Sequence, residues 1–145
     1  MKFLVINGPN LNMLGLREPT VYGSQNFEAL CGFIKKSCSD IGVECELYQS
    51  NHEGDIVDRI QAAYGNFDGI IINPAAYTHT SVAILDALKA VSIPTVEVHI
   101  SNVMEREEFR HHSFVSYAAV KTFMGYGFDG YRMAAEYLKD YLNQQ

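Results

Sequence analysis

The chain has 145 residues, about the size of one domain, and 48% of them are apolar, a normal level for a globular protein. Its formal net charge of −6 argues against a broad nucleic-acid-binding surface, which would need a basic stripe. No apolar run approaches the roughly 20 residues that span a bilayer, and the apolar start ends too soon for a signal peptide. We therefore expect a single domain over residues 1–145, in the cytoplasm, with no membrane or nucleic-acid partner.

Strands and helices alternate from the start of the sequence. Residues 3–7 form an apolar segment typical of a buried strand, and a loop rich in Gly, Pro and Asn follows over residues 8–24. Apolar residues at helical spacing predict a helix over residues 27–41, with Ser24 as its N-cap and Gly42 as its end.

The three cysteines are Cys31, Cys38 and Cys45. Their odd number and the absence of metal-ligand spacing indicate reduced thiols. Cys31 and Cys38 fall on the apolar face of the first predicted helix, so we interpret these two as buried core residues.

The middle of the chain repeats the same alternation. Residues 43–49 are predicted as the second strand, and apolar residues over 56–63 mark a helix that ends at Gly65. The third strand, residues 69–73, is continuously apolar, which is typical of a sheet covered on both faces.

Residues 81–91 are predicted as a helix and residues 95–100 as the fourth strand. Residues 102–116 are polar and irregular, with room for one helical turn. A short fifth strand over residues 122–124 and a closing helix over residues 129–143 complete the pattern.

This alternation predicts an α/β fold: a flavodoxin-like, doubly wound parallel sheet of five strands in the order 2-1-3-4-5, with helices on both faces. Ligands of such sheets bind beyond the carboxyl ends of the strands. The loops after strands one to four collect Asn, His, Arg and Tyr and contain no lysine. We expect these loops to form the functional site.

Glu97 and His99 lie two apart near the end of the fourth strand, so their side chains share a face. A carboxylate beside an imidazole fixes its tautomer and suits it for general acid catalysis. The alternative is a purely structural polar pair at the sheet edge.

Arg17 and Tyr22 share the long first loop. A nearby guanidinium favours the phenolate form of a tyrosine, which would make Tyr22 a base near neutral pH. The alternative is that Tyr22 packs and Arg17 is solvated.

Two further segments could bind an anion. The helix that starts near Ser81 offers free N–H groups at its N-terminus, although Thr80 or Ser81 could simply cap it. Arg106 and Arg110 would share a side on one helical turn and could bind carboxylates or hydroxyls, unless they form a solvated face with the neighbouring glutamates.

Several motifs are absent from the sequence: the Gly-rich dinucleotide fingerprint, the Walker lysine motif, the nucleophile elbow and any metal-ligand spacing of histidines. The residues therefore indicate acid–base chemistry on a small, anionic, hydroxylated substrate, with no metal and no cofactor.

Six segments resemble the motifs of type II 3-dehydroquinate dehydratases. They follow the order found in that family and cover nearly the whole chain: NGPNLNMLGLREPTVYG (7–23), QSNHEG (49–54), INPAAYTHTSVAI (72–84), EVHISN (97–102), EEFRH (107–111) and GYGFDGY (125–131). The resemblance implies conversion of 3-dehydroquinate to 3-dehydroshikimate through an enolate, in the shikimate pathway of aromatic amino acid biosynthesis.

The resemblance also implies catalytic roles. Tyr22 matches the base that removes a proton next to the ketone, and Arg17 matches the residue that keeps this tyrosine ionised. Asn10 matches the residue that holds a water against the developing enolate oxygen. His99 matches the acid that protonates the departing hydroxyl, with Glu97 orienting it.

Substrate-binding roles follow in the same way. Asn73 and Ser101, with the backbone N–H groups around Ile100, match a clamp for the substrate carboxylate. His79 and Arg110 match the residues that contact the ring hydroxyls.

Two residues match further features of the family. Arg106 resembles a lid residue, and Asp86 matches a residue that reaches the site of a neighbouring subunit in a homododecamer, a tetramer of trimers. The chain departs from the usual pattern at Ala75, where Gly is common, at Leu85, where Arg is frequent, and at Lys121, where Gly is frequent.

The alternative from a different functional class is a flavodoxin-like module that binds phosphate or flavin at the turn over residues 78–81. Such a module would retain FMN after purification.

Overall fold

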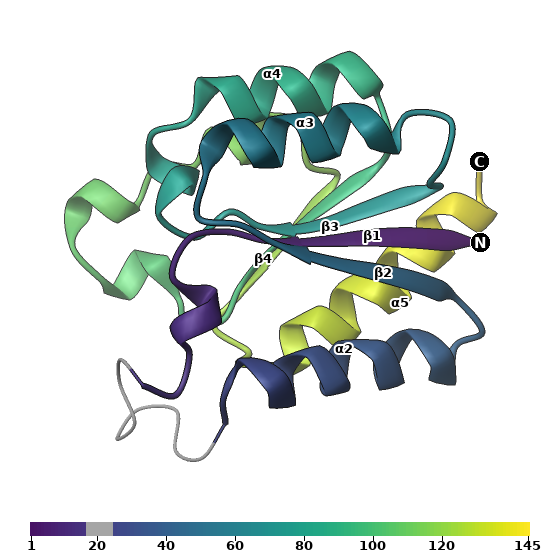
Figure 1. The fold of residues 1–145 in the computed structure, drawn as a ribbon, viewed down its shortest axis with the longest axis horizontal. Helices are drawn as coiled ribbons and strands as arrows, with labels where there is room; N and C mark the ends of the chain where they lie inside the picture. Colours follow the sequence, from purple (N-terminus) through teal and green to yellow (C-terminus); the bar gives the residue numbers. More distant parts are fainter. Residues whose placement is uncertain (17–24) are drawn as a thin grey trace.

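A five-stranded parallel sheet forms the centre of the molecule, which we describe from a computed structural model of residues 1–16 and 25–145 (Figure 1). The strand order β2-β1-β3-β4-β5 and the parallel pairing of all neighbours confirm the predicted α/β topology. The strands are β1 (Lys2–Asn7), β2 (Glu44–Gln49), β3 (Gly69–Asn73), β4 (Thr95–His99) and β5 (Lys121–Met124).

Two helices cover each face of the sheet (Figure 1). On one face lie α2 (Phe27–Asp40) and α5 (Asp129–Asn143), and on the other lie α3 (Glu53–Ala63) and α4 (Val82–Val91). Short 3-10 helices follow the strands: η1 (Leu11–Met13), η2 (Ala75–His79), η3 (Val103–Glu105), η4 (Glu108–Arg110) and η5 (Val115–Tyr117).

The first strand supplies apolar side chains to both faces. Phe3 and Val5 pack into the core shared with α2 and α5, whereas Leu4 and Ile6 pack into the core shared with α3 and α4. Side chains alternate along a strand, so a sheet covered on both faces requires this unbroken apolar run.

The same alternation sets the orientation of the polar residues of β4. Val96 and Val98 belong to the core on the α2–α5 face. Glu97 and His99 therefore point to the opposite face, on the side of α4, where they lie at the carboxyl end of the strand.

The start of α2 differs from the prediction. Asn26 is the N-cap, because its side-chain oxygen accepts a hydrogen bond from the Ala29 N–H over 2.9 Å. The predicted cap, Ser24, lies outside the described residues. Asn and Ser are equally good caps, so composition alone did not distinguish the two positions.

The segment over residues 102–116 also differs, because it contains separate 3-10 turns instead of one helical turn. Asn102 caps the first turn by accepting a hydrogen bond from the Met104 N–H. Arg106 ends that turn in an extended conformation, so the backbone does not continue as a helix towards Arg110.

The cysteines are free thiols, as the sequence indicates. Cys38 is buried in the core as predicted, but Cys31 is only partly buried. Among the described residues, no helix combines the length and apolar character needed to cross a bilayer.

The end of β1 requires a glycine. Gly8 N–H donates to the Asn73 carbonyl over 2.8 Å, and a Cβ at Gly8 would lie 2.5 Å from the Pro74 carbonyl oxygen. We predict that Gly8→Ala lowers the free energy of unfolding by about 2 kcal/mol, since backbone atoms must move to relieve the overlap. Denaturant unfolding at one protein concentration measures this change.

Gly54→Ala is the matched control, because a Cβ at Gly54 meets no atom within 4 Å and Ala favours the helix. Its stability should equal or exceed that of the wild type. Equal stability of the two variants would contradict the proposed overlap at Gly8.

Candidate active site

A cavity of about 200 Å³ lies at the carboxyl ends of β1, β3 and β4. This is the edge at which ligands bind in open α/β sheets, and the volume is below the ~300–1,000 Å³ of typical ligand pockets, which favours a small ligand. The predicted site residues that line it are Asn10, Asn73, His79, His99, Ile100, Ser101, Arg106 and Arg110.

Among the described residues, two predicted site residues, Glu97 and Asp86, do not line the cavity. Arg17 and Tyr22 lie outside the described residues. Glu97 is fully buried behind His99, and Asp86 is exposed on α4. The loop after β2 contributes no lining residue, but Asn51 from that loop contacts Asn10.

The cavity is cationic in an acidic protein. Arg106, Arg110, His79 and His99 line it, and no carboxylate lies among its lining residues in the described part of the chain. A local cluster of one charge sign raises the concentration of oppositely charged ligands whatever the net charge of the protein. The cavity therefore favours an anionic ligand.

The sequence left open whether Arg110 faces a ligand or pairs with the neighbouring glutamates, and the structure shows it both at the cavity and beside Glu107. Its Nε lies 3.2 and 3.3 Å from the two carboxylate oxygens of Glu107, and the residue also lines the cavity. Arg106 lies on the same cavity although the two arginines occupy different turns. The ion pair with Glu107 restricts the guanidinium of Arg110 beside the cavity.

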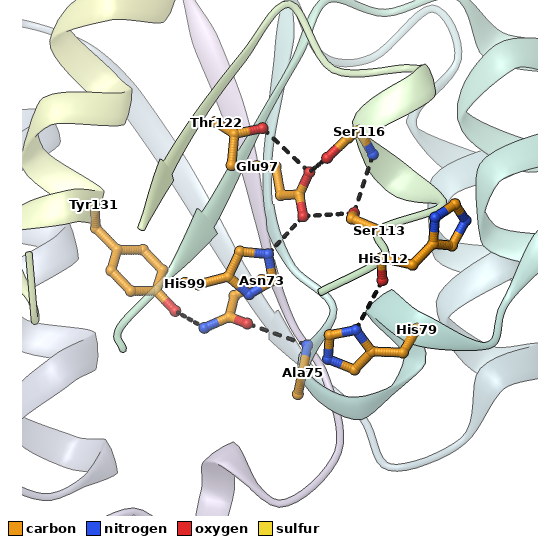
Figure 2. Close-up of polar contacts among 10 residues, drawn as sticks. All are labelled: Asn73, Ala75, His79, Glu97, His99, His112, Ser113, Ser116, Thr122 and Tyr131. Atoms are coloured by element: carbon orange, nitrogen blue, oxygen red, sulfur yellow. Dashed lines mark hydrogen bonds and ion pairs between the residues drawn. The ribbon is translucent and has the colours of Figure 1, made fainter. Parts of the chain in front are cut away.

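Glu97 and His99 form the buried polar pair that the strand spacing predicts. His99 Nε2 lies 2.5 Å from Glu97 Oε2, and the carboxylate is 0% exposed (Figure 2). Burial alone would raise the pKa of Glu97, but hydrogen bonds from His99, Ser116 and Ser113 hold the pKa below its ordinary value. Glu97 is therefore an anion that fixes the orientation of the His99 ring.

His79 has a defined tautomer. Its Nδ1 lies 2.9 Å from the His112 carbonyl oxygen, which can only accept, so Nδ1 carries a proton (Figure 2). Partial burial lowers the pKa of His79, and the nearby His99 and Arg110 lower it further, although the bond to His112 opposes them. The neutral ring at neutral pH leaves Nε2 as an acceptor for a ligand hydroxyl.

Asn10 has a left-handed backbone conformation, with φ of 70°, which Asn tolerates better than most residues. Its N–H donates to Asn51 Oδ1 over 3.0 Å. Gln49 Nε2 donates to the same oxygen and to the Gly8 carbonyl, both over 3.1 Å. Gln49 at the end of β2 and Asn51 in the loop after it therefore hold the loop that presents Asn10 to the cavity.

Asn73 is held by a buried hydrogen-bond chain. Tyr131 of α5 donates from its hydroxyl to Asn7 Oδ1 over 2.6 Å and accepts from Asn73 Nδ2 over 3.0 Å. Asn73 Oδ1 accepts from the Ala75 N–H (Figure 2). Burial raises the pKa of Tyr131, so its hydroxyl stays protonated and can donate.

Ala75, one of the departures from the family pattern, adopts φ of 52° at the cavity wall. The left-handed region costs an L-residue roughly 1–2 kcal/mol, so the loop keeps this conformation despite the Cβ. The bond from Ala75 N–H to Asn73 stabilises the turn.

The N-terminus of α4, which the sequence suggested as an anion site, does not lie at the cavity. Ser81 caps α4 by accepting from the Ile84 N–H over 3.0 Å, and no residue of α4 lines the cavity. The 3-10 helix η2 lies between β3 and α4, and Ala75, Ala76 and His79 of η2 line the cavity instead.

Sequence reasoning missed the groups that support the site from behind. Ser113, Ser116 and Thr122 donate to Glu97, and Tyr131 holds Asn73. Only Thr122 had a usable signal, because it lies beside Glu97 in the register of the two final strands. Within residues 1–16 and 25–145, no group of three His, Cys, Asp or Glu side chains could hold a metal ion.

Known proteins are similar to this chain over nearly its whole length. The family model described as "Dehydroquinase class II" matches residues 1–139. A 3-dehydroquinate dehydratase of Clostridium acetobutylicum is 54% identical, covering 99% of this chain and 100% of the relative. A catabolic 3-dehydroquinase of Aspergillus oryzae is 56% identical, covering 93% and 88%. A crystal structure of the type II dehydroquinase of Butyrivibrio crossotus is 56% identical, covers 96% and 97%, and has a TM-score of 0.92.

We predict that Tyr131→Phe lowers the free energy of unfolding by about 1–3 kcal/mol, since buried Asn7 and Asn73 would each lose a hydrogen-bond partner. Tyr64→Phe is the control, because Tyr64 is 70% exposed. Denaturant unfolding compares the two variants. Equal losses would mean that the buried hydroxyl does not stabilise the site.

Proposed function

The chain belongs to the class II dehydroquinase family, and from this membership we propose how its residues carry out the reaction. The reaction is the dehydration of 3-dehydroquinate, a hydro-lyase step of the shikimate pathway. One observation supports the assignment of roles. A cationic cavity lies at the carboxyl edge of the sheet, and it is lined by His99, whose ring is hydrogen-bonded to the Glu97 carboxylate.

Elimination of water next to a ketone needs three functions: a base, stabilisation of charge on the enolate oxygen, and an acid for the leaving group. In our proposal Tyr22 is the base, and Arg17 favours its phenolate form. Asn10 holds a water against the enolate oxygen. Its position at the cavity wall, on a loop braced by Asn51, supports this role.

His99 is the proposed acid. Glu97 Oε2 accepts a hydrogen bond from His99 Nε2, which leaves Nδ1 as the ring nitrogen that can donate to the leaving hydroxyl. Only the charged imidazole can donate from both nitrogens. The orientation of the ring follows from its contact with Glu97.

The remaining cavity residues bind the substrate in this proposal. Asn73 and Ser101, with backbone N–H groups around Ile100, bind the carboxylate. His79 accepts from a ring hydroxyl, and Arg110 donates to one. Their common location on one small cavity supports the assignment.

Arg106 is the proposed lid residue. Arg106 is partly exposed at the cavity, where it could contact the substrate from the solvent side. A guanidinium suits this position because it binds carboxylates and hydroxyls through several donors.

The comparisons decide between the dehydratase and the alternative flavin or phosphate module. The family match and the full-length relatives are dehydroquinases. The turn over residues 78–81, where the module would bind phosphate, forms the end of η2 and the Ser81 cap of α4. The flavodoxin-like topology is therefore the scaffold of a hydro-lyase.

We further propose a single catalytic domain that acts in the cytoplasm as a homododecamer, a tetramer of trimers. Asp86 would reach the site of a neighbouring subunit. Its exposed position on α4, outside the cavity of its own chain, agrees with a contact between subunits.

We predict that Tyr22→Phe and His99→Ala each lower kcat at least about a thousandfold, in line with the loss of a general acid or base, while the fold persists. The assay follows the ultraviolet absorbance of the conjugated product from 3-dehydroquinate. Wild-type protein treated with EDTA or borohydride should keep its activity, because neither a metal nor a Schiff base takes part.

Tyr64→Phe serves as the control for the tyrosine substitution, since this side chain is exposed on the surface. A fully active Tyr22→Phe variant would remove Tyr22 as the base. A flat trace from folded wild-type protein would refute the dehydratase function.

The assembly is tested by light scattering, with an expected mass near twelve times the 16.3 kDa of one chain. Asp86→Asn should raise KM on the order of tenfold, the effect of one weakened charged hydrogen bond. Asp58→Asn, a substitution on the exposed side of α3, should leave KM unchanged. A monomer in solution, with Asp86→Asn fully active, would refute the contact.

A further inference from the structure

We propose that Ser113, Ser116 and Thr122 are positioning residues that set the charge of the acid. Their hydroxyl groups hold the Glu97 carboxylate as an anion, and this anion keeps the His99 imidazole doubly protonated. We call these three side chains the hydroxyl cluster. The inference rests on the proposed role of His99, and it adds residues that do not line the substrate cavity.

Each oxygen of the Glu97 carboxylate has two donors (Figure 2). Ser116 Oγ and Thr122 Oγ1 lie 2.6 and 3.2 Å from Oε1. His99 Nε2 and Ser113 Oγ lie 2.5 and 2.7 Å from Oε2. An ionised carboxylate offers about four acceptor sites, so four donors occupy all of them. A proton on either oxygen would displace one of these contacts.

A further hydrogen bond sets the direction of the Ser113 contact. The Ser116 N–H donates to Ser113 Oγ over 3.2 Å, so the hydroxyl of Ser113 accepts there and directs its own O–H at Glu97. Thr122 lies beside Glu97 in the register of β4 and β5. The hydroxyl donors therefore come from η5, from Ser113 just before it and from the neighbouring strand β5, and all must be in place to surround the carboxylate.

The hydroxyl cluster determines where the proton lies between Glu97 and His99. A carboxylate with all acceptor sites in use cannot donate, so the shared proton belongs to His99 Nε2. A neutral His99 ring would then have only a lone pair at Nδ1. Only the charged ring can donate a proton from Nδ1 to a leaving hydroxyl.

The two arginines near His99 oppose a positive charge on its ring. His79, Arg106 and Arg110 line the substrate cavity with it. His99 also lines a second cavity of about 340 Å³, whose other titratable lining residues are His111, His112 and Tyr117. Among the described residues that line these two cavities, none is a carboxylate. Glu97 is thus the anion that favours the charged ring, and its own ionisation depends on the hydroxyl cluster.

A merely structural role of the hydroxyl cluster gives a different expectation. A buried carboxylate needs hydrogen-bond partners in any protein, so loss of one would destabilise the fold. It would not change the charge of His99 or the pH dependence of turnover. The charge of His99 and the pH dependence of turnover therefore distinguish the proposed role from a purely structural one.

The test is Ser116→Ala, which removes one donor from Oε1. We expect kcat to fall on the order of tenfold, with KM within about twofold, since a hydrogen bond to a charged group is lost outside the binding contacts. Loss of a donor raises the pKa of Glu97. As pH falls, Glu97 is then protonated sooner, so the acid limb of the kcat profile should move to higher pH.

Magic-angle-spinning ¹⁵N NMR of histidine-labelled protein reports the charge of His99 without substrate and at any assembly size. His99→Gln identifies the signals of this ring. The wild type should show two protonated ring nitrogens at neutral pH, and Ser116→Ala should lose part of this population to the neutral ring.

Ser116→Thr keeps the hydroxyl at an exposed position and should restore kcat, the pH profile and the ¹⁵N signals. Ser37→Ala removes a serine hydroxyl bonded to the Phe33 carbonyl on α2, on the opposite face of the sheet, and should leave all three unchanged. If Ser116→Ala does not fold, Thr122→Val tests the same oxygen with a side chain of similar shape.

Wild-type ¹⁵N signals and a wild-type pH profile in the folded variant would overturn the proposal, even if kcat fell. Failure of Ser116→Thr to restore them would also overturn it. A wild type without dehydratase activity would refute the proposed function. If Ser116→Ala still lost the charged His99 ring in that case, the action of the hydroxyl cluster would be supported.

Discussion

A carboxylate with no contact to solvent imposes the strictest requirement on this structure. Glu97 remains ionised inside the protein only because donors surround it, since an unpaired buried charge would cost several kcal/mol or be neutralised. The donors lie in β4, in β5, in η5 and at Ser113 just before η5. The irregular segment between β4 and β5 must therefore fold back against the strand, and the position of His99 follows from that packing.

Strand geometry divides the support of the site between the two faces of the sheet. Asn7 and Asn73 point to the α5 face, where Tyr131 bridges them. Glu97 and His99 point to the α4 face. The cavity lies at the carboxyl ends of the strands, where residues supported from both faces of the sheet line it. A displacement of either helix layer would therefore move Asn73 relative to His99.

Local charge and net charge have opposite signs in this protein. The cavity contains arginines and histidines, while acidic residues elsewhere give a net charge of −6. Glu107 holds Arg110 beside the cavity without lining it. Glu97 and Glu107 thus orient His99 and Arg110 from outside the cavity, where the two carboxylates do not contact an anionic substrate.

The sequence by itself determined the strand order, the edge that carries the site and the Glu97–His99 pair, because strand alternation and βα connections are local rules. The resemblance to the family named the polar and charged residues that line the cavity in the described part of the chain. Only the tertiary structure brought Ser113 and Tyr131 to their partners, which lie 16 and 58 residues away in the chain. No local pattern encodes such contacts, since they depend on how a turn and a helix pack against the completed sheet.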